Sequence, residues 1–240
     1  MLFYLAPMEG ITGYIVRNAY AHYFPYIDKY FTPFIPAAKK MSKKIKRDLA
    51  AENNGRIRLV PQLIGNRADE FLMMIRQLED LGSTSVNLNF GCPSGTVVSK
   101  RKGAGFLADP KELEMLLEEV LEKSPLAVSV KTRVGIKDPD EWEALCTAYA
   151  KFPLEELIIH PRLQKDYYSG TPRMETFARA LEQIHVPLCY NGDICSVEDY
   201  KKVTAAFPAI DRIMIGRGLL ENPGLVGEIK GNPPADKARL

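Results

Sequence analysis

The chain lacks long apolar runs and a marked charge excess. No stretch of its 240 residues approaches the eighteen consecutive apolar residues that a membrane-spanning helix needs, and the opening MLFYLAPMEG carries no basic segment of a secretory signal. The formal net charge is only +2, so total charge does not identify a nucleic-acid-binding protein. These absences predict a cytoplasmic protein without a membrane segment, in which the placement of charges matters more than their sum.

Cysteine and histidine are scarce and scattered. The four cysteines form no Cys-x-x-Cys pair, and the three histidines lie far apart in the sequence. We therefore expect reduced thiols and no metal site. Cys146 and Cys189 lie within apolar stretches and are interpreted as inert packing residues, whereas Cys195 stands at a helix start without an assigned role.

The sequence does contain a regular alternation of strand-like and helix-like segments. Hydrophobic residues make up 46% of it, enough for a sizeable core. Eight short β-type runs recur, most of them separated by a helical pattern: LFYLAP, IDKYFTP, RLVPQLIG, STSVNLNFG, LAVSVKTR, ELIIH, PLCYNG and DRIMIG. Such alternation builds a parallel sheet, and eight units in a chain of this size most economically close into an α/β fold, the (β/α)8 TIM barrel with eight parallel strands. A doubly wound open sheet is the alternative.

The helical segments carry clear start signals. In residues 109–124, Asp109 and Pro110 precede a run in which the leucines share one face and the glutamates lie elsewhere. The segments that begin RADEF, DPDEW and SVEDY repeat this design. We expect one barrel domain over residues 1–230, after which glycine and prolines end the last helix and residues 231–240 begin a new helix-like stretch.

Active sites of TIM barrels lie on the loops that follow the carboxyl ends of the strands. The residues at these positions, most of them polar or glycine, are Pro7, Met8, Glu9, Gln62, Asn89, Cys92, Lys131, Arg133, His160, Arg162, Asn191, Gly192, Asp193, Gly216 and Arg217.

Two glycine-containing loops, YNGDI and IMIGRG, follow the seventh and eighth strands. This pair of loops often binds phosphate in barrels, because glycine lets backbone N–H groups approach the anion. Arg217 would add a bidentate contact to the same group. Either loop alone is equally well explained as a tight turn, but together they favour a phosphate site.

Lys131 lies inside an apolar strand, where an ammonium group is costly unless it has a partner or a function. One function is to stabilise the anionic reduced ring of a flavin beside its N1 and C2 carbonyl. A second is a Schiff-base nucleophile, and a structural ion pair is the third interpretation.

Cys92 follows the fourth strand in a loop rich in glycine, so we expect an exposed thiol on a segment that is free to move over a site. No histidine base is placed beside it in the sequence. A proton-donating role is therefore at least as plausible as nucleophilic attack. His160 ends the sixth strand and is a candidate contact to a cofactor ring or phosphate, although a structural histidine is the commoner case.

Two basic clusters follow the second and fourth strands. The first comprises Lys39, Lys40, Lys43, Lys44, Lys46 and Arg47, and the second comprises Lys100, Arg101 and Lys102. Such runs are usually solvated surface, but two of them on one barrel rim favour a polyanionic substrate such as RNA.

In order and position, these motifs resemble the tRNA-dihydrouridine synthase family, whose members are FMN-dependent barrel enzymes. The likeness spans the chain from its start to about residue 225 and rests on APMEGIT, VPQLIG, NFGCP with KRKGAG, SVKTRVG, IIHPR with YYSG, YNGDI and MIGRGLL.

The resemblance implies that NADPH reduces FMN, that hydride passes from flavin N5 to C6 of a tRNA uridine, and that Cys92 protonates C5 to give 5,6-dihydrouridine. It assigns Asn89, Lys100 and Arg133 to the substrate. It assigns the cofactor contacts to Pro7, Met8, Glu9, Gln62, Lys131, His160, Asn191, Gly192, Asp193, Gly216 and Arg217. It further implies that residues 231–240 begin a truncated C-terminal helical domain that binds tRNA, and we expect a monomer.

Three positions depart from the family pattern. The family often has HGR where Pro161 stands between His160 and Arg162, an acidic residue in place of Gly13, and a lysine in place of Gly95. Alternative functions are an FMN-dependent dehydrogenase of a free pyrimidine, resembling dihydroorotate dehydrogenase, a Schiff-base aldolase that uses Lys131, and a noncatalytic RNA-binding module.

Overall fold

The structure, a computed structural model, describes residues 1–234. Of the segment predicted to begin a C-terminal domain, residues 235–240 lie outside the described part. Among the described residues, no helix is both long and apolar enough to cross a bilayer.

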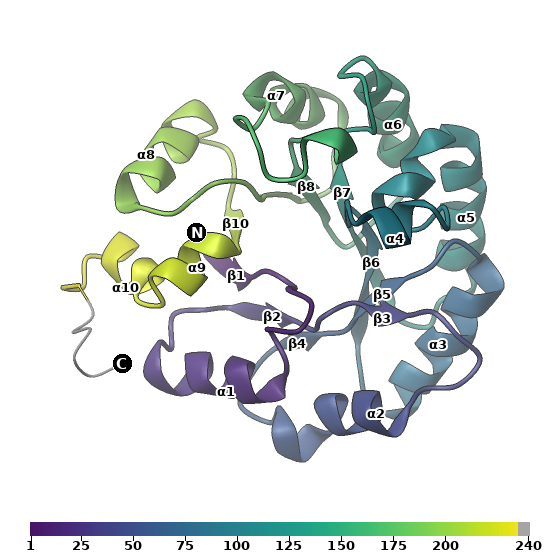
Figure 1. Cartoon of the computed structure of the whole chain (residues 1–240), viewed down its shortest axis with the longest axis horizontal. Coiled ribbons are helices and arrows are strands. Elements are labelled where there is room, and N and C mark those ends of the chain that lie inside the picture. The colour runs from purple at the N-terminus through teal and green to yellow at the C-terminus, as the bar shows by residue number, and fades with distance from the viewer. Residues whose placement is uncertain (235–240) are drawn as a thin grey trace.

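The strands form one parallel sheet that curls into a ring, with the helices around its outside (Figure 1). Their order in the sheet is β3-β5-β6-β7-β8-β9-β10-β1-β2-β4. The strands are β1 (Leu2–Leu5), β2 (Lys29–Phe31), β3 (Ile35–Pro36), β4 (Leu59–Val60), β5 (Gln62–Ile64), β6 (Ser85–Phe90), β7 (Ala127–Arg133), β8 (Leu157–His160), β9 (Leu188–Tyr190) and β10 (Arg212–Ile215).

The third predicted strand is divided, and the second is followed by an additional short strand beyond its predicted end, which gives ten strands in eight positions. Pro61 separates β4 from β5, because proline has no N–H to donate to the ladder. A short connection likewise separates β2, which pairs with β4, from β3, which pairs with β5. At Pro61 the ring closes, since Asn87 N–H donates to the Pro61 carbonyl over 2.9 Å. The predicted (β/α)8 barrel is thus confirmed, with interruptions in its second and third strands.

The four predicted helices form, and two of them have side-chain caps. Asp109 accepts hydrogen bonds from the first-turn N–H groups of Lys111 and Glu112, and Ser196 caps a later helix in the same way. The α-helices are α1 (Tyr14–Tyr23), α2 (Lys43–Leu49), α3 (Ala68–Asp80), α4 (Gly95–Val98), α5 (Pro110–Lys123), α6 (Glu141–Ala150), α7 (Met174–Gln183), α8 (Val197–Ala206), α9 (Arg217–Glu221) and α10 (Leu225–Ile229), and the short 3-10 helices are η1 (Ala51–Asn53), η2 (Gly103–Ala108) and η3 (Gln164–Asp166).

Apolar side chains fill both the barrel interior and the layer between sheet and helices. Cys189 lies in the interior cluster and Cys146 in the outer one, and both are fully buried, as predicted for packing residues. Near the amino ends of the strands, the interior is closed by the buried carboxylate of Glu156, which contacts Lys29 Nζ at 2.7 Å and accepts from the Tyr4 hydroxyl. The barrel interior is therefore closed at this end and can open only at the carboxyl ends of the strands.

Candidate active site

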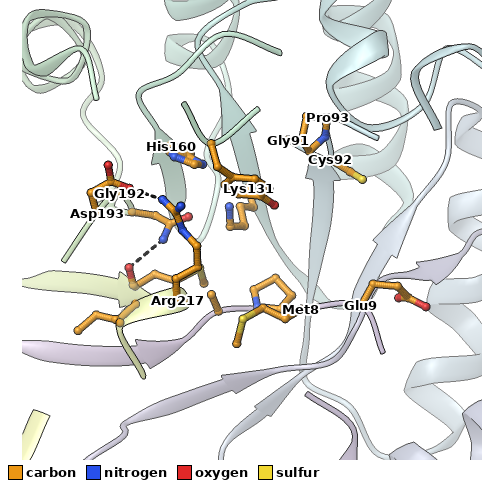
Figure 2. A pocket seen from close by; sticks show the side chains of 18 of the residues that line it. Met8, Glu9, Gly91, Cys92, Pro93, Lys131, His160, Gly192, Asp193 and Arg217 are labelled. Carbon is orange, nitrogen blue, oxygen red and sulfur yellow. Dashed lines mark hydrogen bonds and ion pairs between the residues drawn. The ribbon is translucent and has the colours of Figure 1, made fainter. Parts of the chain in front are cut away.

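A cavity of about 420 Å³ opens at the carboxyl ends of the strands. All the site residues predicted from the sequence line it except Lys100. Figure 2 shows Cys92 on one side of the cavity and the Asp193–Arg217 pair on the other, with Lys131 between them. Segments far apart in the sequence therefore meet in one place, as expected from the position of these residues after successive strands.

Lys100 lies elsewhere. Its side chain is exposed after α4, and its carbonyl accepts a hydrogen bond of 3.1 Å from Asn66 Nδ2. The assignment of Lys100 to the substrate stays a prediction, with the residue outside the cavity lining.

Buried amides position Cys92. The side-chain oxygen of Asn89 accepts from the N–H groups of Gly91 and Cys92 at 3.0 and 2.9 Å, and its nitrogen donates to Gln62 Oε1 at 2.8 Å. Gln62 in turn donates to Asn87 Oδ1 at 2.8 Å. Gln62 begins β5 rather than ending the third strand, because Pro61 divides that strand. The Cys92 turn is therefore fixed to the barrel interior, and the side-chain amides of Asn89 and Gln62, which line the cavity, each keep one N–H that makes no bond to a described residue.

Cys92 is half-buried, contrary to the expectation of an exposed thiol, and its carbonyl accepts from Ala104 N–H at 3.0 Å. Gly103 has φ +54° and packs so closely that a Cβ there would lie 2.9 Å from the Cβ of Cys92. Gly103 and Gly105 thus permit close packing, whereas a Cβ at Gly95 would meet open space. The mobility of the loop stays a prediction. Burial raises the pKa of the Cys92 thiol, so it is protonated at neutral pH and can act as an acid.

Lys131 has no neutralising partner among residues 1–234, since no carboxylate lies within 4 Å and no hydrogen bond is made. The interpretation as a structural ion pair is therefore wrong for the described part of the chain. Burial and the nearby Arg133 lower the pKa of Lys131 to about 8. An ammonium group in such a position is suited to stabilising an anion that arrives in the cavity.

Arg133 is almost fully buried and lacks a carboxylate partner within the described residues. It donates to three backbone carbonyls, those of Gly91, Leu163 and Tyr167, at 2.9, 2.8 and 2.6 Å. Burial lowers its pKa to about 10, so it stays charged at neutral pH. These bonds tie the Cys92 turn to the segment 163–170, which we call the β8–α7 loop.

His160 is buried as a neutral imidazole. Burial and the surrounding cations hold its pKa well below the ordinary value. Its Nε2 lies 3.1 Å from Arg162 Nη1. Because a guanidinium only donates, Nε2 is the acceptor and Nδ1 carries the proton.

The loops after β9 and β10 carry the features expected of an anion site. Gly192 and Gly216 line the cavity, and no described residue accepts from their N–H groups. Arg217 donates through Nη2 to Asp193, which leaves its other donors available. Asn191 fixes the first loop to the neighbouring strand by donating to the Met214 carbonyl at 2.9 Å.

The segment Pro7–Glu9 forms the wall below the cavity. Met8 N–H donates to Thr12 Oγ1 at 2.9 Å, which closes a turn. Glu9 is exposed and makes no ion pair with a described residue.

Where the family often has an acidic residue, Gly13 is accompanied by Asp48 of α2, which accepts from Tyr14 N–H at 2.7 Å. A neighbouring helix thus supplies the carboxylate that the position itself lacks.

Tyr168 was missed as a functional candidate, and Arg162 was noted after the sixth strand without an assigned role. Arg162 is fully buried and holds Asp193 with both terminal nitrogens. Tyr168 lines the cavity, and its ring lies 5.0 Å from the Arg217 guanidinium carbon and 5.5 Å from that of Arg133. Both occur in quoted motifs, IIHPR and YYSG, but only the fold shows that these segments meet.

The lysine-rich segment before and within α2 is exposed. None of its basic residues forms an ion pair with a described residue. In the second cluster, Arg101 pairs with Glu112 and Lys102 is half-buried. The two clusters follow β3 and β6, which flank β5, so they belong to adjacent sectors of one rim.

No group of three or more potential metal ligands of the His, Cys, Asp and Glu types is found in residues 1–234.

Known proteins resemble the chain in both sequence and fold. It is 31% identical over 232 residues to a tRNA-dihydrouridine(16) synthase of Pseudomonas putida, covering 92% of this chain and 71% of that protein. It is 30% identical to a tRNA-dihydrouridine synthase B of Pasteurella multocida, covering 92% and 67%. Morphinone reductase superposes with a TM-score of 0.66 at 11% identity, covering 98% of this chain and 87% of the other, a likeness of fold alone.

Residues 4–239 match the sequence model of the family described as "Dihydrouridine synthase (Dus)". The match includes the Cys92 turn, Lys131 and both glycine loops, which the structure assembles around one cavity. The chain belongs to the dihydrouridine synthase family.

Proposed function

We propose that this protein reduces uridine in tRNA to 5,6-dihydrouridine, with FMN as its bound flavin and NADPH as reductant. The observation that carries the proposal is the cavity itself, which combines a protonated thiol, an unpaired lysine and two glycine loops with free N–H groups, all within residues 1–234. The family supports the reaction class, and the names of the relatives support tRNA as substrate.

The residues present fit FMN. The free N–H groups of Gly192 and Gly216, with the remaining donors of Arg217, would bind its phosphate. Lys131 would lie against the flavin ring, where its unneutralised charge favours the reduced, anionic form. When bound and reduced, FMN supplies the hydride that adds to C6 of the uracil.

Cys92 completes the reduction at the other carbon of the double bond. Its S–H bond breaks as a C–H bond forms at C5, and the resulting thiolate regains a proton from solvent, so hydride and proton together saturate the ring. Asn89 is suited to hold the base edge, since it fixes the Cys92 turn and keeps one N–H for the cavity. The base reaches this enclosed position only after leaving its stack in the RNA.

The exposed lysines along α2 would bind the phosphate backbone around the extruded base. Their charges are not neutralised by described carboxylates, which is what counterion release on RNA binding requires. A cytoplasmic location and a monomeric state remain predictions.

The absorption spectrum of the purified protein tests the proposal. Bound flavin gives a yellow protein, and NADPH under anaerobic conditions should bleach it. Addition of tRNA should then restore the colour, with one dihydrouridine formed for each flavin reoxidised. A colourless protein that borohydride traps as a covalent adduct with a carbonyl substrate would instead support a Schiff-base aldolase, an alternative favoured by the lowered pKa of Lys131.

A further inference from the structure

Asp193 lies in the predicted phosphate site yet carries the same sign of charge as a phosphate. Its backbone has φ +41°, in the left-handed region that few non-glycine residues adopt, and its carboxylate lines the cavity. A carboxylate aimed at a phosphate would repel it, so direct contact is a poor explanation for this residue.

The carboxylate is instead held by two guanidinium groups. Arg162, which is fully buried, donates to Oδ1 at 2.9 Å and to Oδ2 at 2.5 Å, a bidentate arrangement. Arg217 donates to Oδ1 at 2.5 Å through Nη2 alone. Burial would by itself raise the pKa of Asp193, but its bonds to both arginines lower it, so it is ionised at neutral pH.

Arg162 also fixes the second group that contacts Arg217. Its Nε and Nη2 donate to the carbonyls of Ser169 and Gly170 in the β8–α7 loop. That loop carries Tyr168, whose ring lies 5.0 Å from the Arg217 guanidinium carbon. One buried arginine therefore positions both the carboxylate and the aromatic ring that confine Arg217.

The cluster of Arg162, Asp193 and Arg217 has a net positive charge, as an anion site requires. Arg162 neutralises Asp193, which leaves the charge of Arg217 for a ligand, and Arg217 uses one terminal nitrogen within the protein. Its side chain is 45% exposed, so without these contacts it would sample many rotamers. Preorganising its planar fork lowers the entropy cost of binding a phosphate.

We propose that Asp193, held by Arg162, is a positioning residue that orients Arg217 toward the flavin phosphate and thereby makes the cavity select FMN over riboflavin. This inference rests on the proposed function for the identity of the ligand. It assigns Asp193 a role through Arg217 instead of the direct cofactor contact that the family resemblance implies.

The test measures the dissociation constants of FMN and riboflavin for the flavin-free full chain by fluorescence quenching. Asp193→Asn keeps the shape of the side chain and removes its charge. Simple electrostatics predicts tighter FMN binding, because a negative charge has gone, whereas loss of positioning predicts weaker binding. We expect the FMN dissociation constant to rise by roughly tenfold or more while that of riboflavin changes little.

Two variants accompany it. Arg217→Lys keeps the charge on an exposed side chain but removes the planar fork, and it should reduce the preference for FMN even if Asp193→Asn folds poorly. Asp69→Asn removes the same charge from the exposed Arg67–Asp69 pair on α3 and should change neither constant. In the Arg217→Lys background, Asp193→Asn should have little additional effect.

The outcomes distinguish failure of the positioning role from failure of the flavin assignment. If Asp193→Asn binds FMN as tightly as the unaltered protein or more tightly, or if Arg217→Lys keeps the full preference, the positioning role is overturned while the flavin assignment stands. If the unaltered chain binds neither flavin, the proposed function fails, and this inference fails with it.

Discussion

Lys131 and Arg133 carry positive charge into the cavity, and no described carboxylate lies within 4 Å of either. Such charges are usually paired, since removing them from water is costly. Arg133 donates hydrogen bonds to three backbone carbonyls, which offset its desolvation, but Lys131 has no such compensation from the described residues. A site with uncompensated positive charge is stabilised when an anion binds, and the proposed flavin would be such an anion.

Replacing Cys92 by alanine should separate the two half-reactions. Reduction of flavin by NADPH needs no acid at the uracil and should keep its rate in stopped-flow measurements. Dihydrouridine formation, followed by mass spectrometry of tRNA, should fall by about 10²–10⁴-fold, as for a missing general acid.

The matched control is Cys195→Ala, because this half-buried cysteine lines the same cavity without an assigned role. It should retain both steps. Equal loss of both steps in Cys92→Ala would identify Cys92 as a structural residue.

Lys131→Met should stabilise the flavin-free protein and impair the loaded one. Burial lowers the pKa of Lys131 to about 8, so at pH 7 folding confines a charge that water would solvate. We expect the free energy of unfolding of the flavin-free chain to rise by about 1–3 kcal/mol in urea denaturation. The reduction potential of bound flavin should become more negative, because the reduced anion no longer has a neighbouring positive charge.

The pH dependence gives this prediction a sign. The destabilisation caused by burying the charged Lys131 side chain is fully present below pH 8. It disappears between pH 8 and the ordinary lysine pKa of 10.5, because in this range the unfolded chain holds the proton more tightly than the folded one. The stability gained by Lys131→Met should therefore shrink as the pH rises through this window. Lys123→Met, on the exposed surface of α5, should show no such trend, and a gain that persists to pH 10 would contradict the assignment.

At the level of elements, the β8–α7 loop joins the two sides of the cavity. Arg133 holds it through Leu163 and Tyr167, and Gln164 Nε2 donates to the Pro93 carbonyl at 3.0 Å. Arg162 holds its other end at Ser169 and Gly170. The Cys92 turn and the glycine loops are therefore coupled through this loop, by hydrogen bonds to its backbone carbonyls and by the ion pair between Arg162 and Asp193.

Alternation of strand and helix patterns was sufficient to predict the barrel, and all the predicted site residues except Lys100 line its cavity. The pattern did not show that Pro61 divides a strand, because the apolar run continues on both sides of it. It also predicted an exposed Cys92 where the structure has a half-buried one, since a glycine that relieves crowding, as Gly103 does, cannot be told in sequence from one in an open loop. The Asp193–Arg162 pair joins residues 31 positions apart, and only the closed sheet brings them together.

Alanine at Lys43, Lys44 and Lys46 tests the role of α2 in RNA binding. These side chains lie on the outer surface of the helix, so the fold and the flavin spectrum should be unaffected. Filter binding across a salt series should show lower tRNA affinity and a shallower dependence on log salt. The slope should fall by roughly 0.7–0.9 for each phosphate that the protein no longer neutralises.

Three exposed lysines on outer helices provide the control: Lys123, Lys201 and Lys202. Their replacement removes the same charge from the chain and should leave the slope nearly unchanged. If the control lowers affinity as much as the α2 variant, the effect comes from net charge, and the RNA binds elsewhere.

For the whole molecule, the two ends of the barrel differ in charge and access. The amino end is sealed by Glu156 with Lys29 and Arg212, whereas the carboxyl end is open and carries the lysine-rich rim. In the proposed reaction, tRNA and NADPH therefore approach the cavity from the same side. Competition between them at the rim would appear as a salt-sensitive slowing of NADPH oxidation when tRNA is in excess.

The uneven pairing of the ring has a consequence for how the molecule opens. From Ser85 to Phe90, β6 pairs with β7 without interruption, whereas β2 and β4 pair at only two positions beside Pro61. β9 and β10 pair at a single position. Amide hydrogen exchange should therefore be faster in β2–β5 and β9–β10 than along β6–β8, and uniform exchange would contradict this. Because Cys92 and Lys131 lie on the slow part, partial opening at Pro61 would release Gln62 from Asn89 before it separated Cys92 from Lys131.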